Sequence, residues 1–266
     1  MPITSEVIGI PGSKPALVLV HGLGSAGTIW KSLFEGLREH FVIYPIDLPG
    51  HGAAALKEEP LDPKSLAAQI VQVLERDYGV HQFHIAGNSL GGWIALETGA
   101  LHPERVSSVT ALAPAGLWHE GPTQVLPPSL TARLIAKCAQ YFLHLAYHLP
   151  PLKAVGYRKI THLWRELSFE SCKDSVIAMA KSTGYTPMWR SLRHKKFEGQ
   201  IPPTTPVKVI FGDYDLMLPH PRAQAREVAP KHCEWIVVEN CAHVIMWNYP
   251  HLTIDFIASQ VRTKSQ

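Results

Sequence analysis

A pentapeptide of the pattern Gly-x-Ser-x-Gly occupies positions 87–91, between a short apolar run and a stretch of helical character. A serine in this pattern lies on a sharp turn from a strand to a helix, where a strained backbone conformation exposes its hydroxyl group. The two glycines are needed because side chains at their positions would collide with the neighbouring strand and helix. Residues 83–86 predict a buried strand and residues 90–101 a helix. The pattern therefore predicts that Ser89 stands on an elbow at the end of a strand.

Short apolar runs rich in β-forming residues alternate with helix-like stretches through most of the chain. The runs are mostly apolar on both faces, which is typical of parallel strands covered by helices. This alternation predicts an α/β fold with a doubly wound, mostly parallel sheet. Residues 3–10 are a candidate for a further, antiparallel edge strand. The predicted strands are residues 16–20, 41–46, 83–86, 106–112, 207–211 and 235–238, and the predicted helices are residues 28–38, 63–77, 90–101, 219–228 and 250–261.

The alternation stops between residues 117 and 199, where the periodicity is helical and no run is a convincing strand. We therefore expect a helical cap over residues 117–199, inserted into an α/β core of residues 1–116 and 200–266. Within the cap, a spacing of three or four residues predicts the apolar stripe of an amphipathic helix. This stripe either lines an acyl pocket or forms the core of the cap. It consists of Leu134, Cys138, Tyr141, Leu145 and Leu149.

Composition and charge limit the classes of function. The chain has 266 residues and a net charge of +3, a surplus too small to indicate nucleic-acid binding. No stretch reaches 18 uninterrupted apolar residues, so we expect no stable membrane insertion. The first residues lack the basic head and apolar core of a secretory signal, and the four cysteines form no CxxC pair. We therefore expect reduced thiols and a cytoplasmic location.

The predicted cap is more basic than the rest of the chain. Residues 117–198 hold twelve Lys and Arg against five Asp and Glu, a surplus of +7. This surplus has two interpretations. The basic residues either form a solvated face or attract an anionic substrate. For the second interpretation, Arg190 is the candidate contact, and Trp118 and Trp189 are candidates for lining an apolar pocket.

Two groups that a serine nucleophile requires follow later in the chain. A serine hydroxyl is a poor nucleophile unless a base takes its proton and a third group orients that base. Asp213 and Asp215 lie on the loop after the strand predicted at 207–211, and His243 lies just beyond the last predicted strand. Open α/β sheets build their sites on loops beyond the carboxyl ends of strands. The order serine, aspartate, histidine predicts a catalytic triad in which either aspartate is the acid.

Backbone donors for a tetrahedral intermediate are also available. The segment His-Gly-Leu-Gly at positions 21–24 directly follows the first predicted strand. Glycine there lets the backbone approach a substrate, so the Leu23 N–H can point inward, and the Leu90 N–H at the start of the elbow helix is a second donor. Donors of this kind contribute on the order of 3 kcal/mol each to the stability of the transition state.

Together these segments resemble the α/β-hydrolase superfamily over essentially the whole chain except the cap. The resemblance implies that Ser89 is the nucleophile, His243 the base and Asp215 the acid, with an oxyanion hole formed by Leu23 and Leu90. A serine at the elbow separates this chain from the haloalkane dehalogenases and epoxide hydrolases of the same fold, which place an aspartate there. The resemblance rests on positions 21–24, 47–52, 87–92, 212–215 and 241–243.

The elbow at 87–92 and the segment Ala-Pro-Ala-Gly-Leu at 113–117 are further similar to meta-cleavage-product hydrolases, which break C–C bonds. Those enzymes carry a Gly-Pro-Gly-Ala type of oxyanion loop where this chain has Leu-Gly-Ser-Ala at 23–26. They also tend to have Trp at the position of Val244. We therefore expect a carboxylesterase-type serine hydrolase acting on a small-molecule ester or thioester, with C–C bond hydrolysis as the alternative. A non-catalytic ligand receptor on the same fold is a third hypothesis.

We expect no metal, nucleotide or redox cofactor. His144 and His148 lie one helical turn apart, but no carboxylate or third ligand accompanies them. Asp47 and His51 are expected to stabilise the loop that contains them. Cys241 is expected to be a buried side chain that only fills space. The sequence leaves the oligomeric state open.

Overall fold

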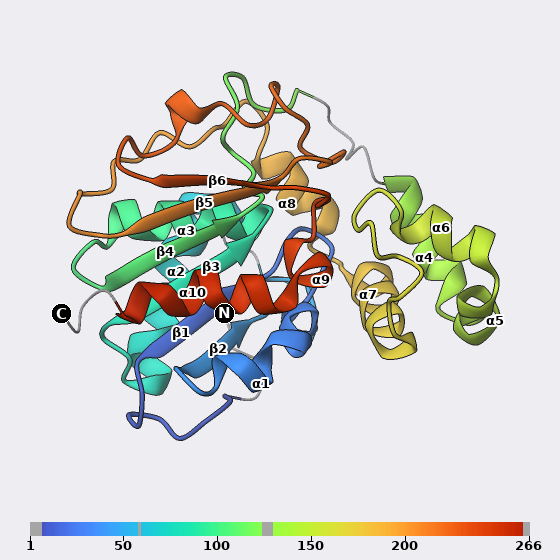
Figure 1. The fold of residues 1–266 in the computed structure, drawn as a ribbon, viewed down its shortest axis with the longest axis horizontal. Coiled ribbons are helices and arrows are strands. Elements are labelled where there is room, and N and C mark those ends of the chain that lie inside the picture. The colour runs from blue at the N-terminus through green and yellow to red at the C-terminus, as the bar shows by residue number, and fades with distance from the viewer. Residues whose placement is uncertain (1–6, 58–59, 124–129, 263–266) are drawn as a thin grey trace.

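A six-stranded sheet runs through the centre of the protein, and all six strands that the structure describes are parallel (Figure 1). The computed structural model describes residues 7–57, 60–123 and 130–262. Most strand residues are buried because helices cover both faces of the sheet, which confirms the predicted doubly wound α/β fold. The strand order is β2-β1-β3-β4-β5-β6. The strands are β1 (Ala16–Val20), β2 (Val42–Ile46), β3 (Phe83–Asn88), β4 (Val106–Leu112), β5 (Val207–Gly212) and β6 (Glu234–Val238).

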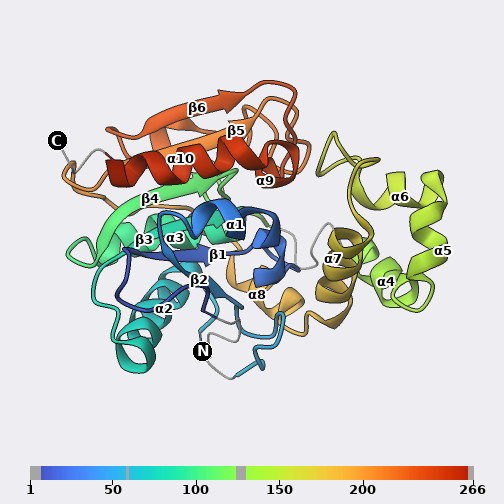
Figure 2. The same cartoon turned by 60° about the horizontal axis from the view of Figure 1, so that its bottom comes forward.

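Two layers of helices enclose this sheet. On one face, α2 (Pro63–Tyr78) packs against α3 (Leu90–Leu101). On the other face, α10 (Pro250–Arg262) lies beside the 3₁₀ helix η1 (Gly27–Leu33) and α1 (Phe34–Leu37), as Figure 2 shows. The hydrophobic core fills both spaces between the helices and the sheet.

The order of the strands reverses at β1. The chain adds β2 on one side of β1, and β3 with all later strands on the other side. The crevice beyond the carboxyl ends of β1 and β3 is therefore the topological switch point, where open α/β sheets bind ligands. The loops that begin at His21 and Ser89 both leave the sheet at this crevice.

The predicted strands are confirmed with ends shifted by at most two residues. The helix predicted over 28–38 is helical but divided between η1 and α1. The predicted edge strand at 3–10 is represented by an antiparallel bridge between Ile8 and Ile43, and residues 3–6 lie outside the described residues.

The helix predicted over 219–228 is wrong. This segment consists of turns followed by the short 3₁₀ helix η2 (Arg226–Val228). Pro221 works against a helix that begins at 219, because a proline disfavours the helical conformation of the residue before it, here His220.

The helices between β4 and β5 fall within the limits of the predicted cap. Of these, α7 packs on α4 and also contacts η1 of the core, whereas α4, α5 and α6 form a lobe on the side away from the sheet (Figures 1 and 2). The division of the chain into a core and a cap domain stays a prediction. The five described helices of this region are α4 (Leu130–Ala139), α5 (Leu143–His148), α6 (Pro150–Tyr157), α7 (Phe169–Lys181) and α8 (Tyr185–Ser191).

The apolar stripe expected on one amphipathic helix is divided and exposed. Helix α4 ends at Ala139 and α5 begins at Leu143, with a turn between them. Tyr141 in this turn is 78% exposed, and Leu145 on α5 is 60% exposed. The prediction of one helix was therefore wrong, and these two side chains do not form the core of the cap.

Candidate active site

Ser89 stands on a strained turn between β3 and α3. Its φ of 58° and ψ of −117° lie outside the regions that a residue with a side chain normally adopts. Two hydrogen bonds of 2.9 Å hold this backbone, because the Ser89 N–H donates to the carbonyl of Leu112 and the Ser89 carbonyl accepts from the N–H of Ala115. The turn also needs glycine, since a Cβ at Gly87 would collide with the backbone of Gly91. Ser89 itself is half-buried.

His243 and Asp215 form a buried pair on the loops that follow β6 and β5. The Nδ1 atom of His243 lies 2.7 Å from Oδ2 of Asp215. The other carboxylate oxygen accepts hydrogen bonds of 2.8 Å from the backbone N–H groups of Met217 and Leu218. Both oxygens of the carboxylate are thus engaged, so its orientation toward the imidazole is fixed.

The environment of Asp215 favours its ionised form. Burial by itself would raise the pKa of this carboxyl, but the charge interaction and hydrogen bond with His243, together with the two backbone donors, outweigh burial and lower the pKa. An ionised carboxylate only accepts hydrogen bonds, so the His243 Nδ1–H donates to Asp215. In the neutral imidazole this leaves Nε2 as the acceptor, which is the form that a general base requires.

Asp213, the competing candidate for the acid, has a different contact. Its side chain accepts a hydrogen bond of 3.0 Å from the backbone N–H of Cys241, and the residue is exposed. Asp213 therefore supports the loop that leads to His243, whereas Asp215 contacts the imidazole itself.

The loop after β1 lies directly against the serine. A Cβ at Gly22 would come within 3.1 Å of the Ser89 Cβ and 3.7 Å of its Oγ, so only glycine leaves this approach open. Leu23, the next residue, is half-buried, and Leu90 is the first residue of α3. In the described part of the chain, neither the Leu23 N–H nor the Leu90 N–H has a hydrogen-bond acceptor. Both predicted oxyanion donors are therefore free to bind one.

His21 locks this loop in place. The Leu48 N–H donates to Nε2 of His21 at 3.0 Å, so the other ring nitrogen carries the hydrogen and donates to the Gly22 carbonyl at 2.7 Å. Burial lowers the pKa of His21, which keeps the ring neutral and this tautomer in place. The sequence suggested no role for this histidine beyond its place in the motif.

The loop after β2 is held as expected from the sequence. Asp47 accepts hydrogen bonds from the N–H groups of Gly27 at 2.7 Å and Ala53 at 3.0 Å. His51 is buried, and its Nδ1–H donates to the Pro49 carbonyl at 3.1 Å. Burial, together with the neighbouring His21, lowers the pKa of His51 to about 3. Both side chains support the walls of the crevice.

Asn88 is a site residue that sequence reasoning missed. Its side-chain amide donates to the carbonyls of Leu112 at 3.1 Å and His243 at 3.2 Å. It thereby joins the strand that carries the serine to the loop that carries the histidine. No local pattern distinguishes this asparagine, because its two acceptors come from other parts of the chain.

The three predicted substrate-contact residues differ in their surroundings. Trp118 packs edge-to-face on Trp93 with ring centroids 5.5 Å apart, and its Nε1–H donates to the Lys195 carbonyl at 2.9 Å. These contacts give Trp118 a structural role. Trp189 is half-buried against the core, and Arg190 is exposed on α8. A substrate contact for any of these three stays a prediction.

We searched the described residues for side chains that could hold a metal ion. No group of three or more His, Cys, Asp or Glu side chains suited to a metal ion occurs among the described residues. The rings of His144 and His148 do lie together, with centroids 4.6 Å apart. Cys241 is buried, and burial raises the pKa of its thiol to about 12, which agrees with the expected filler role.

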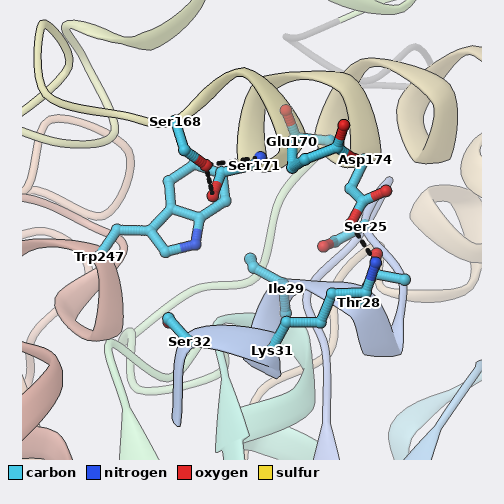
Figure 3. Close-up of a pocket in the computed structure, with 11 residues that line it drawn as sticks. Ser25, Thr28, Ile29, Lys31, Ser32, Ser168, Glu170, Ser171, Asp174 and Trp247 are labelled. Carbon is cyan, nitrogen blue, oxygen red and sulfur yellow. Dashed lines mark hydrogen bonds and ion pairs between the residues drawn. The ribbon is translucent and has the colours of Figure 1, made fainter. Parts of the chain in front are cut away.

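A cavity of about 310 Å³ lies beside the site, between η1 and α7 (Figure 3). Lys31 of the core and Asp174 of the cap form an ion pair of 2.6 Å in its wall. Trp247 of α9 (Ile245–Asn248) closes one side, only four residues after His243. None of Ser89, Asp215 and His243 lines this cavity. Its lining residues are Ser25, Thr28, Ile29, Lys31, Ser32, Ser168, Glu170, Ser171, Asp174, Ser175 and Trp247.

The chain matches a protein-family model and is similar in sequence to a known lipase. The model of the family described as "Alpha/beta hydrolase family" matches residues 17–256. Monoacylglycerol lipase abhd6-B of Xenopus laevis is 23% identical over 269 residues, which cover 94% of this chain and 77% of that protein.

Solved structures of other proteins share the fold of this chain. A membrane phospholipase A superposes with a TM-score of 0.74 and 24% identity, over 96% of this chain and 81% of that one. A meta-cleavage product hydrolase of Pseudomonas fluorescens IP01 superposes with a TM-score of 0.70 and 15% identity, over 96% and 93%. Since identities this low show only the fold, the chemistry has to be argued from the site itself.

Proposed function

Because the chain belongs to the alpha/beta hydrolase family, we propose that it is a serine hydrolase that cleaves a carboxylic ester through an acyl-enzyme. The observation that carries this proposal is the buried pair of His243 and Asp215 on the two loops beyond β5 and β6, at the same edge of the sheet as the strained Ser89. The imidazole is oriented by an ionised carboxylate and presents Nε2 as a base.

In the proposed reaction, Ser89 Oγ attacks the ester carbonyl while Nε2 of His243 takes its proton. The N–H groups of Leu23 and Leu90 bind the oxyanion, and Asp215 stabilises the imidazolium. The C–O bond then breaks, and His243 returns the proton to the leaving alcohol. A water molecule repeats these steps on the acyl-enzyme and releases the acid. Apart from the ester and the water molecule, the groups named in these steps all belong to this chain.

The relatives favour an ester of a fatty acid as the substrate class. A monoacylglycerol lipase aligns with 94% of this chain, so a monoacylglycerol is the first natural type of substrate to test. C–C bond hydrolysis of a vinylogous diketone is the alternative, since a meta-cleavage product hydrolase shares the fold. The oxyanion loop at 23–26 and Val244 depart from that group and favour the ester.

A chain-length series tests this proposal. We expect wild-type protein to turn over p-nitrophenyl esters many times per molecule and to release fatty acid from a monoacylglycerol, and Ser89→Ala to do neither. Ester cleavage that persists in Ser89→Ala would contradict the mechanism. A burst without turnover would indicate a ligand receptor, and turnover restricted to a vinylogous diketone would indicate a C–C hydrolase.

A further inference from the structure

The lobe formed by α4, α5 and α6 exposes an unusual amount of apolar surface. Sixteen large apolar side chains are exposed in the part of the chain that the structure describes, and eight of them lie between residues 134 and 155. Single exposed apolar residues need no explanation, but a concentration of this kind marks an interaction surface. The eight are Leu134, Ile135, Tyr141, Phe142, Leu145, Leu149, Leu152 and Val155.

The same lobe carries charge of one sign. Residues 130–160 contain five Lys and Arg and no Asp or Glu. Lys137, Arg158 and Lys159 are exposed, whereas Lys153 is buried and donates hydrogen bonds to backbone carbonyls. Within residues 130–160, the exposed apolar side chains are therefore accompanied by cations alone, and the exposed Glu166 lies beyond this range.

A basic pocket borders this surface. Its volume is about 440 Å³, and it lies where α6 begins. Two guanidinium groups, those of Arg158 and Arg165, line it, and Arg165 stacks over the Trp164 ring at 4.1 Å. Among the described residues, neither arginine has a carboxylate partner within ion-pair distance. Paired guanidinium groups beside an aromatic ring suit a phosphate group. Pro150, Pro151 and Ala154 complete the lining.

We propose that the α4–α6 lobe docks this protein on the surface of an anionic phospholipid bilayer. The exposed apolar side chains enter the interface, and Arg158 and Arg165 bind a lipid phosphate. Apolar side chains that flank Lys and Arg are the pattern of peripheral helices that lie in an anionic interface. Docking of this kind needs no spanning helix, and none of the described helices is long and apolar enough to cross a membrane.

The charge of the lobe argues against a second copy of this chain as the occupant. A symmetric contact through the lobe would bring Lys137, Arg158 and Lys159 of one copy toward the same cations of the other. Like charges brought together in this way oppose association. An anionic bilayer supplies both the apolar phase and the compensating charge.

Sedimentation with vesicles tests the proposal on the Ser89→Ala variant of residues 1–266. This variant leaves the lipids intact, so the result is independent of the proposed hydrolase activity. We expect binding to vesicles of 70% phosphatidylcholine and 30% phosphatidylglycerol in 0.1 M salt. Binding to pure phosphatidylcholine vesicles, and to the mixed vesicles in 1 M salt, is expected to be at least about tenfold weaker because the charge attraction is absent or screened.

Paired variants locate the surface. One double variant combines Tyr141→Ser with Leu145→Ser, and the other combines Arg158→Glu with Arg165→Glu. We expect each to weaken binding to the mixed vesicles about tenfold or more. The melting temperature should not change, because all four residues are exposed. The control for the apolar pair is Ile10→Ser, and the control for the arginine pair is the double variant Lys14→Glu with Lys231→Glu. Ile10 and Lys14 precede β1 and Lys231 precedes β6, so all three lie near the amino ends of the strands. The affinity of these controls for the mixed vesicles should be within twofold of that of the Ser89→Ala parent.

Three results would overturn the proposal. The first is no sedimentation with the mixed vesicles in 0.1 M salt. The second is an equal loss of binding in the lobe variants and the controls. The third is concentration-dependent dimerisation without lipid that the Tyr141 and Leu145 substitutions abolish, because it would make a second copy the occupant.

Discussion

The side-chain amide of Asn88 donates a hydrogen bond of 3.2 Å to the backbone carbonyl of His243. The two residues are 155 positions apart in the sequence, yet this bond joins the strand that ends in the elbow to the loop that carries the proposed base. The same amide binds the Leu112 carbonyl of β4. The position of the histidine relative to Ser89 thus depends on a residue that takes no part in the chemistry.

Replacement of Asn88 by alanine tests this positioning role. We expect kcat for an ester to fall by about 10- to 100-fold with KM nearly unchanged, because small displacements of a catalytic group cost rate rather than substrate binding. The matched variant Asn88→Asp keeps the shape but loses the donors, so it should be similarly impaired. Wild-type kcat in Asn88→Asp would show that the two donated hydrogen bonds do not position the base.

The two aspartates of the loop after β5 should differ sharply. Asp215→Asn removes the charge that orients His243, and we expect kcat to fall by about 10³- to 10⁴-fold. Asp213→Asn keeps an oxygen for the Cys241 N–H, and we expect a change of less than about tenfold. Steady-state kinetics of both variants measures this difference, and the reverse ordering would assign the acid to Asp213.

Buried neutral histidine predicts loss of stability in acid. The pKa of His51 is about 3 in the folded protein, well below its ordinary value near 6.5. Between these values the unfolded chain binds a proton that the folded chain does not, so stability rises with pH by about 1.4 kcal/mol per unit for this group. This contribution is complete above pH 6.5 and is lost as the pH falls toward 3.

Urea unfolding between pH 4 and 7 measures the contribution of His51. His51→Asn preserves an N–H for the Pro49 carbonyl but cannot titrate, so the dependence of the unfolding free energy on pH should become shallower in this variant. The exposed His251→Asn is the matched control and should keep the wild-type dependence. Identical pH dependence in His51→Asn and wild type would contradict this assignment.

The approach of Gly22 to Ser89 predicts a cost in activity for any side chain at position 22. A Cβ at position 22 would lie 3.1 Å from the Ser89 Cβ, so Gly22→Ala must displace the loop or the serine by a few tenths of an ångström. We expect kcat to fall by about tenfold or more. Gly156→Ala, where a Cβ meets nothing within 4 Å, is the control and should leave kcat unchanged. Equal kcat values in the two variants would show that the loop tolerates the displacement.

Local patterns were sufficient to predict the sheet and the candidate triad positions. The strands are mostly apolar runs, and Ser89, Asp215 and His243 each lie in a short motif near the end of a strand. The same loop also offered Asp213, so the sequence alone did not decide which aspartate is the acid. Asn88 and His21 were not recognised, because their roles depend on acceptors or donors contributed by distant segments.

The region between β4 and β5 was the least predictable part of the chain. Periodicity placed Tyr141 and Leu145 on one apolar stripe, but whether such a stripe is buried depends on what packs against it. In the structure α4 and α5 are short helices, and Leu134, Ile135 and Leu145 on them are exposed. A spacing of three or four residues is the same for a core and for a docking surface, so the sequence could not separate them.

Labelling with a fluorophosphonate, followed by peptide mass spectrometry, tests the central claim most directly. We expect one adduct per molecule on Ser89, loss of ester turnover in proportion to labelling, and much slower labelling in His243→Ala because the base is missing. Ser89→Ala should remain unlabelled and inactive with an unchanged melting temperature. A fluorophosphonate adduct on another residue together with ester turnover retained in Ser89→Ala would show that Ser89 is not the nucleophile.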